Sequence, residues 1–384
     1  MIDLIFWGGL LLIGYTYIGY PILLALLARL RRPWHGLREV EAPLVSVLVP
    51  AYNEGSVIAE KVANTLEQDY PLPRMEILVG SDGSSDRTAE VVGALGDRHP
   101  NVRLFDFQAR RGKVAVLNDL VREAEGEVLV FTDANSMMNS GALARLTAHF
   151  SDPLVGAVSG EKVIVSRDAD DLIGEGEGIY WRYESYIKAK ESEIHSVIGA
   201  DGALWAMRRA LFQEAPRDTL VDDFLISMRV LAAGGRIVYE KGAYVREEAL
   251  DDWKAEYVRK VRIAAGAFQS IPRLKTFLSP AQGMSFLFYV SHKLIRWIAP
   301  FIYLCALAAN VVLASGSTLY TALLAAQLAA FGAVFAGYLC KGRPEKNRFL
   351  HFVFYFAMTN FAQLMGLVNL VRRRQKVTWE KKDR

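Results

Sequence analysis

Acidic residues gather in three short segments, each directly after a run of apolar, β-branched residues. The segments are Pro50–Glu54, Ser81–Asp86 and Thr132–Asn135. Taken singly, acids in such places also serve as turn and helix-cap residues. Three of them that follow three strands suggest more, because the carboxyl ends of parallel strands meet at one edge of a sheet, where ligands bind. We therefore expect one polar site built from all three segments.

The residue types in these segments suit a phosphorylated ligand held through a divalent cation. Carboxylates alone would repel phosphate, whereas a hard cation binds the oxygens of both. Asp133 and Asn135 offer two such oxygens at i and i+2, and Asp82 can accept hydrogen bonds from a base or a ribose. In Arg111-Gly-Lys113, at a predicted helix start, the lysine adds a cation for a phosphate oxygen, although such a lysine is usually a surface residue. The chain has neither G-x-x-x-x-G-K-[S/T] nor G-x-G-x-x-G, which argues against a P-loop or a dinucleotide site.

Two further groups of charged residues lie nearer the C-terminus. Asp222 and Asp223 precede a predicted helix, 224–233, and an acid there can be a helix cap. The alternative is a general base that deprotonates an acceptor hydroxyl. Arg259 and Arg262 lie one turn apart on another predicted helix. Together they can clamp a leaving pyrophosphate or lie at a membrane surface, and both roles can hold at once.

The elements that must position these residues alternate between strands and helices. Short apolar runs predict strands at 44–49, 75–79, 102–105 and 127–131. Amphipathic patterns between and after them predict helices at about 55–68, 86–95, 113–124 and 140–150. This alternation predicts an α/β domain with a parallel, helix-covered sheet.

The two ends of the chain are apolar and predict membrane-spanning helices. Residues 3–28 are long enough to cross roughly 30 Å of hydrocarbon. A cleaved signal peptide fits poorly, because the first residues carry no positive charge. Since positive residues stay on the cytoplasmic side, we expect the N-terminus outside and the next domain in the cytoplasm. The residues that carry this expectation are Arg29, Arg31, Arg32 and Arg38.

Three more apolar segments lie near the C-terminus, at 294–314, 317–339 and 349–371. The first two form a predicted hairpin, and the basic loop 341–348 after them is expected inside. If 349–371 also spans, the basic tail lies outside, against the same rule. Asn360 and Gln363 in this segment indicate packing on protein. The count stays open between three and four spans.

These patterns divide the chain into five parts and exclude some functions. The net charge of +3, with no basic stretch that interleaves aromatic residues, argues against nucleic-acid binding. The two cysteines and six histidines show no metal-ligand spacing. The parts are a transmembrane helix at 1–29, a cytoplasmic domain at 40–249, interfacial amphipathic helices at 250–291, a transmembrane region at 292–372 and a basic tail at 373–384.

In this order the motifs resemble the family 2 glycosyltransferases, in their membrane-bound, polysaccharide-synthase-like branch, which includes synthases of cellulose, hyaluronan and poly-N-acetylglucosamine. The resemblance covers about residues 43–270 well. It implies a GT-A-type domain with flanking transmembrane helices and an inverting transfer from a nucleotide-sugar, with UDP favoured. It also implies a multi-pass protein of the inner (plasma) membrane. The motifs are Val47–Glu54, Ser81–Asp86, Arg111-Gly-Lys113 to Asn118, Asp133-Ala-Asn135, Gly199-Ala-Asp201-Gly202 and Asp222-Asp223.

The resemblance also implies a role for each matching residue. Asp82 corresponds to the base-recognising aspartate, and Lys113 to the phosphate-contacting lysine. Asp133 corresponds to the first acid of the D-x-D motif, which holds Mg²⁺ or Mn²⁺ with Asn135 as its partner. Asp223, next to Asp222, corresponds to the general base. Of the remaining residues, Ala51, Tyr52 and Glu54 would line the nucleotide pocket, Gly199, Asp201 and Gly202 the acceptor wall, and Arg259 and Arg262 the diphosphate.

Two departures from the family pattern leave the product open. The second metal ligand is neutral, because Asn135 replaces an acid. The Q-x-x-R-W motif of processive members reads Arg259-Lys-Val-Arg262-Ile263, without its tryptophan. A polysaccharide synthase is the leading hypothesis, and a single-transfer enzyme with a lipid-linked or glycolipid acceptor is the alternative. A catalytically silent nucleotide-binding subunit is a third hypothesis, which the three intact aspartates disfavour. Three or four spans make only a narrow channel, so a homo-oligomer or secretion partners remain open.

Overall fold

The computed structural model describes residues 1–30, 41–165, 172–248, 253–340 and 348–377. It divides into two compact units. The first comprises Met1–Arg31, Ile164–Ile187 and Glu248–Gln375, and the second Arg32–Val163, Lys188–Glu247 and Lys376–Arg384. The predicted basic segments at 31–40 and 341–347, which include Arg31, Arg32 and Arg38, lie outside the described residues, as does the end of the tail.

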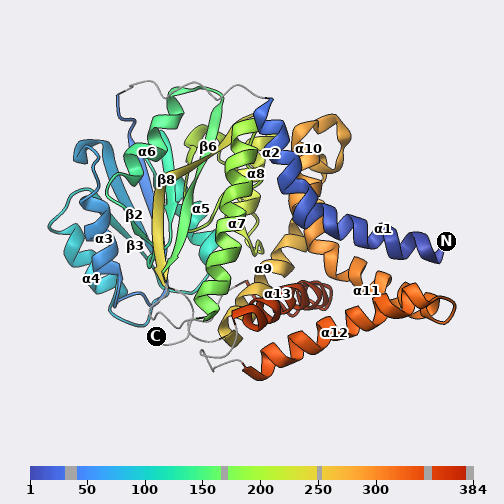
Figure 1. Cartoon of the computed structure of the whole chain (residues 1–384). Helices are drawn as coiled ribbons and strands as arrows, with labels where there is room; N and C mark the ends of the chain where they lie inside the picture. The colour runs from blue at the N-terminus through green and yellow to red at the C-terminus, as the bar shows by residue number, and fades with distance from the viewer. Residues whose placement is uncertain (31–40, 166–171, 249–252, 341–347, 378–384) are drawn as a thin grey trace. The chain divides into compact units, whose positions relative to one another are not determined.

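An eight-stranded sheet in the order β3-β2-β1-β4-β7-β6-β8-β5 is the centre of the second unit (Figure 1). β1 is parallel to β2 and β4, and β2 is parallel to β3, as predicted. The strands are β1 Val45–Ala51, β2 Met75–Asp82, β3 Val102–Phe107, β4 Val128–Thr132, β5 Met137–Met138, β6 Val155–Val165, β7 Leu204–Arg208 and β8 Arg236–Glu248.

The other half of the sheet differs from the prediction, because it is antiparallel. β7 pairs antiparallel with β4 and β6, and β5 antiparallel with β8. The stacked rings of Phe131 and Trp205, 4.2 Å apart, join β4 to β7 at one register position. The sequence pattern predicts only the four parallel strands, because β8 mixes charged and small residues with its apolar ones. The fold is therefore an α/β domain with a mixed sheet.

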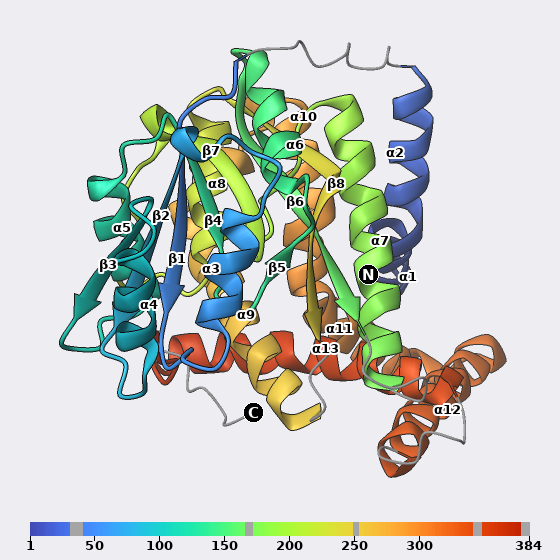
Figure 2. The ribbon, with the colours of Figure 1, turned by 90° about the vertical axis from the view of Figure 1, so that its left-hand side faces the viewer.

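Helices cover the sheet on both faces (Figures 1 and 2). Successive strand residues point to opposite faces, so Val47 and Val49 share one core with Ile58 and Val62 of α3. On the other face α5 packs so closely on β2 that a Cβ at Gly80 would collide with Val116. The helices of this unit are α3 Ile58–Leu66, α4 Thr88–Gly96, α5 Lys113–Glu123, α6 Ala142–Ala148 and α8 Asp222–Ala232.

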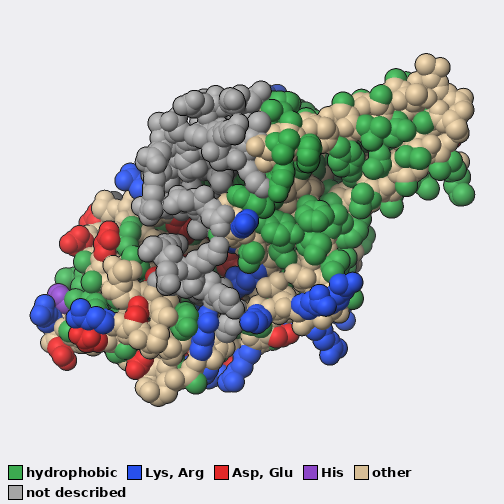
Figure 3. All heavy atoms as spheres, turned by 90° about the horizontal axis from the view of Figure 1, so that it is seen from below, with side chains coloured by type: hydrophobic (Ala, Val, Ile, Leu, Met, Phe, Trp, Pro, Cys, Tyr) green, Lys and Arg blue, Asp and Glu red, His purple; other side chains and the backbone are tan. Residues whose placement is uncertain are grey.

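Within its described residues, the first unit has four helices that are long and apolar enough to cross a membrane. They are Ile2–Arg29, made of α1 (Ile2–Gly14), a π-helical turn and α2 (Tyr20–Arg29); Met284–Ala314, which includes α10 (Met284–Phe288) and α11 (Ile295–Ala314); Thr318–Leu339 in α12 (Thr318–Cys340); and Phe349–Val371 in α13 (Arg348–Val371). Figure 3 shows hydrophobic side chains over the helical part of this unit, and Leu11, Val312 and Phe335 are among the exposed ones.

The second apolar helix begins at Met284, ten residues before the predicted start at 294. The difference arises from three charged or titratable residues that interrupt the apolar pattern, His292, Lys293 and Arg296. All three contact Glu184 of α7 (Leu172–Ile194), with His292 Nε2 at 3.0 Å and Lys293 Nζ at 3.4 Å. Burial alone would raise the pKa of Glu184, but these positive charges hold it well below its usual range. Pairing therefore lets the helix continue through its charged residues.

α13 packs on α9 (Trp253–Arg273), which agrees with the expected packing on protein. The Tyr355 hydroxyl donates to Glu256 Oε1 at 3.3 Å. At Gly366 a Cβ would lie 2.5 Å from the Ala264 Cβ and collide with it, so only hydrogen at this position allows the close approach.

Candidate active site

The three acidic segments lie at one edge of the sheet, as the strand prediction requires. β1, β2 and β4 end at Ala51, Asp82 and Thr132, and all three run parallel. The register pairs Ala51 with Ser81, so the segments that follow start side by side. This edge is where the ligand of an α/β sheet binds.

Asp82 fixes the loop that leads into α5. Its two carboxylate oxygens accept hydrogen bonds from the backbone N–H groups of Arg111 and Gly112, at 2.7 and 2.8 Å. Gly112 has φ +91° and Gly83 φ +66°, and a Cβ at position 83 would lie 2.7 Å from the Arg110 nitrogen. Asp82 thus positions the start of α5, while its contact with a nucleotide base stays a prediction.

Two of the residues predicted to line the nucleotide pocket contact the chain beyond the second acidic segment. Ala51 is buried, and the Glu54 N–H donates to Thr88 Oγ1 at 2.8 Å. Tyr52 presents its ring to Arg110, whose guanidinium carbon lies 3.7 Å from the ring centre. Arg110 is not among the site residues predicted from the sequence; the basic pair before Gly112 is the signal that could have revealed it.

Lys113 joins the acids of two different elements. Its Nζ lies 2.6 Å from Asp133 Oδ1, after β4, and 3.9 Å from Asp222 Oδ2, at the start of α8. Burial lowers the pKa of Lys113, but the attraction of Asp133, Asp222 and Asp223 raises it more, so the net shift is upward. The lysine is therefore a fixed positive charge among the three carboxylates and not a surface residue.

Asp222 and Asp223 occupy the first turn of α8 and do not cap it. Val221 is at the N-cap, and no side chain caps the helix there. Burial, together with repulsion from Asp222, raises the pKa of Asp223 to about 7, although the attraction of Lys113 opposes the rise. A carboxyl that titrates near neutral pH can take up a proton and release it again, which suits a general base.

The segment from Gly199 to Gly202 lies against this acid. Gly199 has φ +86°, and a Cβ there would collide with the Phe224 ring. A Cβ at Gly202 would lie 2.7 Å from Asp223 Oδ2. The Asp201 N–H donates to Ser159 Oγ at 3.1 Å, and its carboxylate faces Lys188 Nζ at 3.4 Å. The predicted acceptor wall is thus beside the predicted base.

The predicted metal ligands fit a divalent cation that takes most of its ligands from a substrate. Asp133 is about one-third exposed (35% of its side chain) and Asn135 is half-buried. Among the described residues no group of three or more His, Cys, Asp or Glu could hold a metal ion. One carboxylate with an amide oxygen suits Mg²⁺ or Mn²⁺ when phosphate and water oxygens complete the shell.

Arg259 and Arg262 belong to α9 in the first unit. Arg259 Nε donates to Glu256 Oε2 at 2.7 Å, and Glu256 is fully buried. Their predicted contact with a leaving diphosphate stays a prediction.

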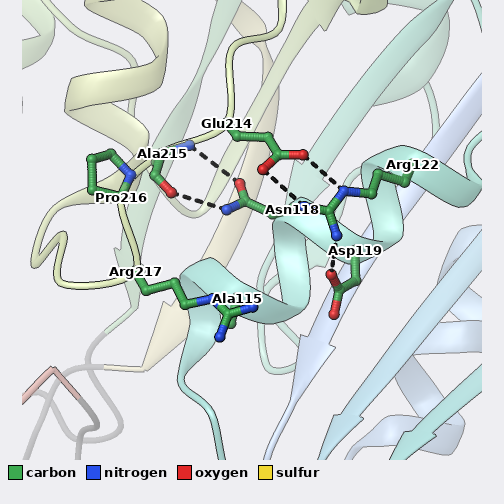
Figure 4. Close-up of a pocket in the computed structure, with 8 residues that line it drawn as sticks. All are labelled: Ala115, Asn118, Asp119, Arg122, Glu214, Ala215, Pro216 and Arg217. Atoms are coloured by element: carbon green, nitrogen blue, oxygen red, sulfur yellow. Dashed lines mark hydrogen bonds and ion pairs between the residues drawn. The ribbon is translucent and has the colours of Figure 1, made fainter.

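A cavity of about 330 Å³ lies beside α5 (Figure 4). Asn118 closes one side of it: its Nδ2 donates to the Ala215 carbonyl at 2.9 Å, and its Oδ1 accepts from the Ala215 N–H at 3.3 Å. Arg122 reaches Glu214 and Asp119 at 2.8 Å. The acids of the site do not line this cavity, so Asn118 serves to hold α5 to the loop that leads to Asp222.

A model of the family described as "Glycosyltransferase like family 2" matches residues 42–266, which include all the strands and acids of the site. Among solved structures, the mannosyltransferase PcManGT from Pyrobaculum calidifontis, in complex with GDP-Man and Mn²⁺, is similar to this chain with a TM-score of 0.71. It covers 98% of this chain and 100% of its own, at 24% identity.

Two curated relatives show which kinds of protein share the sequence pattern. The beta-monoglucosyldiacylglycerol synthase of Trichormus variabilis is 31% identical over 170 residues, which are 43% of this chain and 36% of that protein. The poly-beta-1,6-N-acetyl-D-glucosamine synthase of Staphylococcus epidermidis is 25% identical over 282 residues, 71% of this chain and 66% of that protein. The chain thus spans between about one-third and two-thirds of the length of these relatives.

Proposed function

We propose that this chain, which belongs to the family 2 glycosyltransferases, is an inverting hexosyltransferase that uses a UDP-sugar to build or extend a polysaccharide at the inner membrane. The observation that carries the proposal is the charged cluster in which Lys113 contacts both Asp133 and Asp222, with Asp223 beside Asp222 on α8. A nucleotide-sugar has negatively charged phosphates next to a reactive anomeric carbon. This cluster offers a cation, Lys113, for the phosphates and a base, Asp223, for the acceptor hydroxyl that attacks the carbon.

The proposed reaction is a single in-line displacement. Asp223 removes the proton of an acceptor hydroxyl, the hydroxyl oxygen bonds to the anomeric carbon, and the bond from that carbon to the nucleotide diphosphate breaks. One displacement inverts the anomeric configuration. Lys113 neutralises charge that develops on the leaving diphosphate, with Arg259 and Arg262 as predicted further partners. A Mg²⁺ or Mn²⁺ ion held by Asp133 and Asn135 would add positive charge at the same phosphates.

The pKa of Asp223 predicts a pH profile. Because a general base acts in its ionised form, kcat/KM should fall about tenfold per pH unit below pH 7 and level off above it. In Asp222→Asn the repulsion that helps to raise the pKa of Asp223 is gone, so the acidic limb should move to lower pH. Initial rates across pH 5 to about 9, with wild type and variant side by side, measure the shift. A limb that stays in place would remove Asp222 as its cause.

The same shift has a consequence for stability with a defined sign. The folded state holds the Asp223 proton up to a pKa of about 7, whereas the unfolded chain releases it near 3.8. Stability from this group is therefore present below pH 3.8 and declines as pH rises through 7. Above pH 7 the ionised Asp223 carboxylate is available as a base, but it no longer contributes this stability to the folded state.

Four long apolar helices among the described residues support a membrane location. We propose that they anchor the chain as a multi-pass protein, with the sheet domain in the cytoplasm, where nucleotide-sugars are made. Arg29 at the end of the first apolar helix and the basic residues that follow support this orientation. The acceptor is then a carbohydrate or lipid at the same membrane.

A second candidate function is the transfer of one sugar to a lipid-linked or glycolipid acceptor. Ile263, 42% exposed on α9, favours it, because it stands where chain-extending members have a tryptophan for the acceptor. The likeness to a beta-monoglucosyldiacylglycerol synthase agrees with this candidate, and the likeness to a poly-N-acetylglucosamine synthase with the first.

One experiment tests the function and separates the two candidates. Membranes that contain the protein are incubated with a panel of radiolabelled UDP-, GDP- and dTDP-sugars, and nucleotide release and product length are measured. Release with a UDP-sugar and a polymer ladder support the polysaccharide synthase. A lipid-extractable product with one added sugar supports the alternative. No release with any donor would favour a silent nucleotide-binding subunit and overturn the proposal.

A further inference from the structure

Lys61 is a fully buried lysine on the apolar face of α3, and the proposed reaction does not use it. Its Nζ donates to Thr132 Oγ1 at 2.9 Å and contacts the backbone carbonyl of Ser136. Burying an amine costs free energy unless its hydrogens are well placed, so a lysine here needs a specific reason. Both acceptors belong to the same short stretch of chain after β4.

These two acceptors lie on either side of the predicted metal ligands. Thr132 is the residue before Asp133, and Ser136 is the residue after Asn135. The Ser136 N–H donates to the Asp133 carbonyl at 3.2 Å, which closes the turn. Lys61 thus contacts both ends of the turn, while Lys113 contacts the Asp133 carboxylate in its middle. Two lysines therefore hold the turn, one through Thr132 and Ser136 and the other through Asp133.

A second contact fixes the far end of the turn to the sheet. The Ser136 hydroxyl donates to Glu247 Oε1 of β8 at 2.7 Å, and Glu247 forms an ion pair with Lys162 of β6. Ser136 is fully buried, and Thr132 nearly so. The buried polar groups around the turn are therefore paired with one another. Asp133 and Asn135 are the residues of the turn whose side chains stay partly accessible.

We propose that Lys61 is a positioning residue for the diphosphate end of the donor, because it holds Asp133 and Asn135 at the spacing at which they meet the phosphates and their cation. The inference rests on the proposed function, since it needs a donor with a diphosphate. It does not depend on the protonation of Lys61: burial lowers its pKa to about 7, and the neutral amine still has two hydrogens for its two acceptors. A lysine with a purely structural role would affect stability and leave phosphate recognition unchanged.

The test compares Lys61→Met with Asn64→Ala. Methionine keeps the length of the side chain and loses both hydrogen bonds. Asn64 lies one turn further along α3 and exchanges two hydrogen bonds with the backbone of Met138, each 2.9 Å. Its replacement therefore also removes hydrogen bonds between α3 and the chain after β4, but none that involve the turn of Asp133. Titration calorimetry with UDP and with uridine, in the presence of Mn²⁺, is run on detergent-solubilised full-length protein. Thermal unfolding is followed in parallel.

For Lys61→Met we expect UDP to bind about tenfold more weakly and uridine to bind as to wild type, with a matching rise in donor KM. For Asn64→Ala we expect wild-type binding of both ligands. If Lys61→Met does not fold, Thr132→Val serves instead: it removes one of the two acceptors at nearly constant volume and should weaken UDP about threefold.

Three outcomes would overturn the inference: wild-type UDP binding in the folded Lys61 or Thr132 variant, equal weakening of UDP and uridine, or the same selective loss in Asn64→Ala. Failure of the proposed function gives a different result, because wild-type protein would then release no nucleoside diphosphate from any donor sugar. Failure of this inference alone leaves that release intact and changes only the comparison between the variants.

Discussion

Replacing Asp223 with asparagine is expected to lower kcat about a thousandfold and to leave the binding of the nucleoside diphosphate unchanged. Asparagine keeps the shape of the side chain and cannot accept the acceptor's proton. The site is tight here, because Gly202 leaves room for little more than the carboxylate itself. Turnover is measured as release of the nucleotide diphosphate, and binding by calorimetry with the same nucleotide.

The matched control is Asp218→Asn, an exposed acid in the loop before α8. It changes the charge of the same region by the same amount and should keep wild-type turnover. Wild-type turnover in Asp223→Asn would remove the general-base assignment. Equal losses of turnover and of nucleotide binding would indicate a disturbed pocket instead.

Removal of divalent cations is expected to suppress transfer about a hundredfold or more, with recovery on addition of Mg²⁺ or Mn²⁺. The phosphates of the donor carry more negative charge than Lys113 alone neutralises, and Asp133 with Asn135 has oxygens for a cation. Dialysis against EDTA followed by titration with each metal gives the half-saturating concentration. Activity indifferent to EDTA would exclude a metal role for Asp133.

Two variants locate the metal response in the turn. Asp133→Ala should lose activity that no metal concentration restores. Asn135→Asp adds the acid that the family pattern has at this place, so its half-saturating metal concentration should fall severalfold. An unchanged value in Asn135→Asp would mean that this side chain does not bind the metal.

The sequence predicts the parts of the site that follow strand ends, and it does so for a physical reason. Parallel strands of short apolar residues leave one common edge, so Asp82 and Asp133 can be placed there from the pattern alone. The pattern does not predict which residues these side chains pair with. Asp82 accepts from the backbone before α5, and Lys113 pairs with Asp133, through approaches between residues that are distant in the sequence.

Lys61 shows a signal that is present in the sequence and easily passed over. Ile58, Lys61, Val62 and Thr65 share the buried face of α3, so the lysine stands where an apolar residue is expected. His292, Lys293 and Arg296 give the same kind of signal in an apolar helix, and there it moves the predicted boundary. In both helices a charged residue on an apolar face indicates that it has a buried polar partner, but the sequence does not identify that partner.

The pairing of β5 with β8 bears on how the chain acquires its activity during folding. Ser136 and its partner Glu247 are 111 positions apart, and Met137 and Met138 pair with Arg246 and Val245. Contacts of such long sequence separation form late, because the entropy of closing a long loop opposes them. A growing chain can thus complete β1 to β4 and the hydrogen bonds of Lys61 to the turn of Asp133 long before Ser136 meets Glu247. We expect the far end of the turn to be fixed to the sheet in one late step, when β8 joins it.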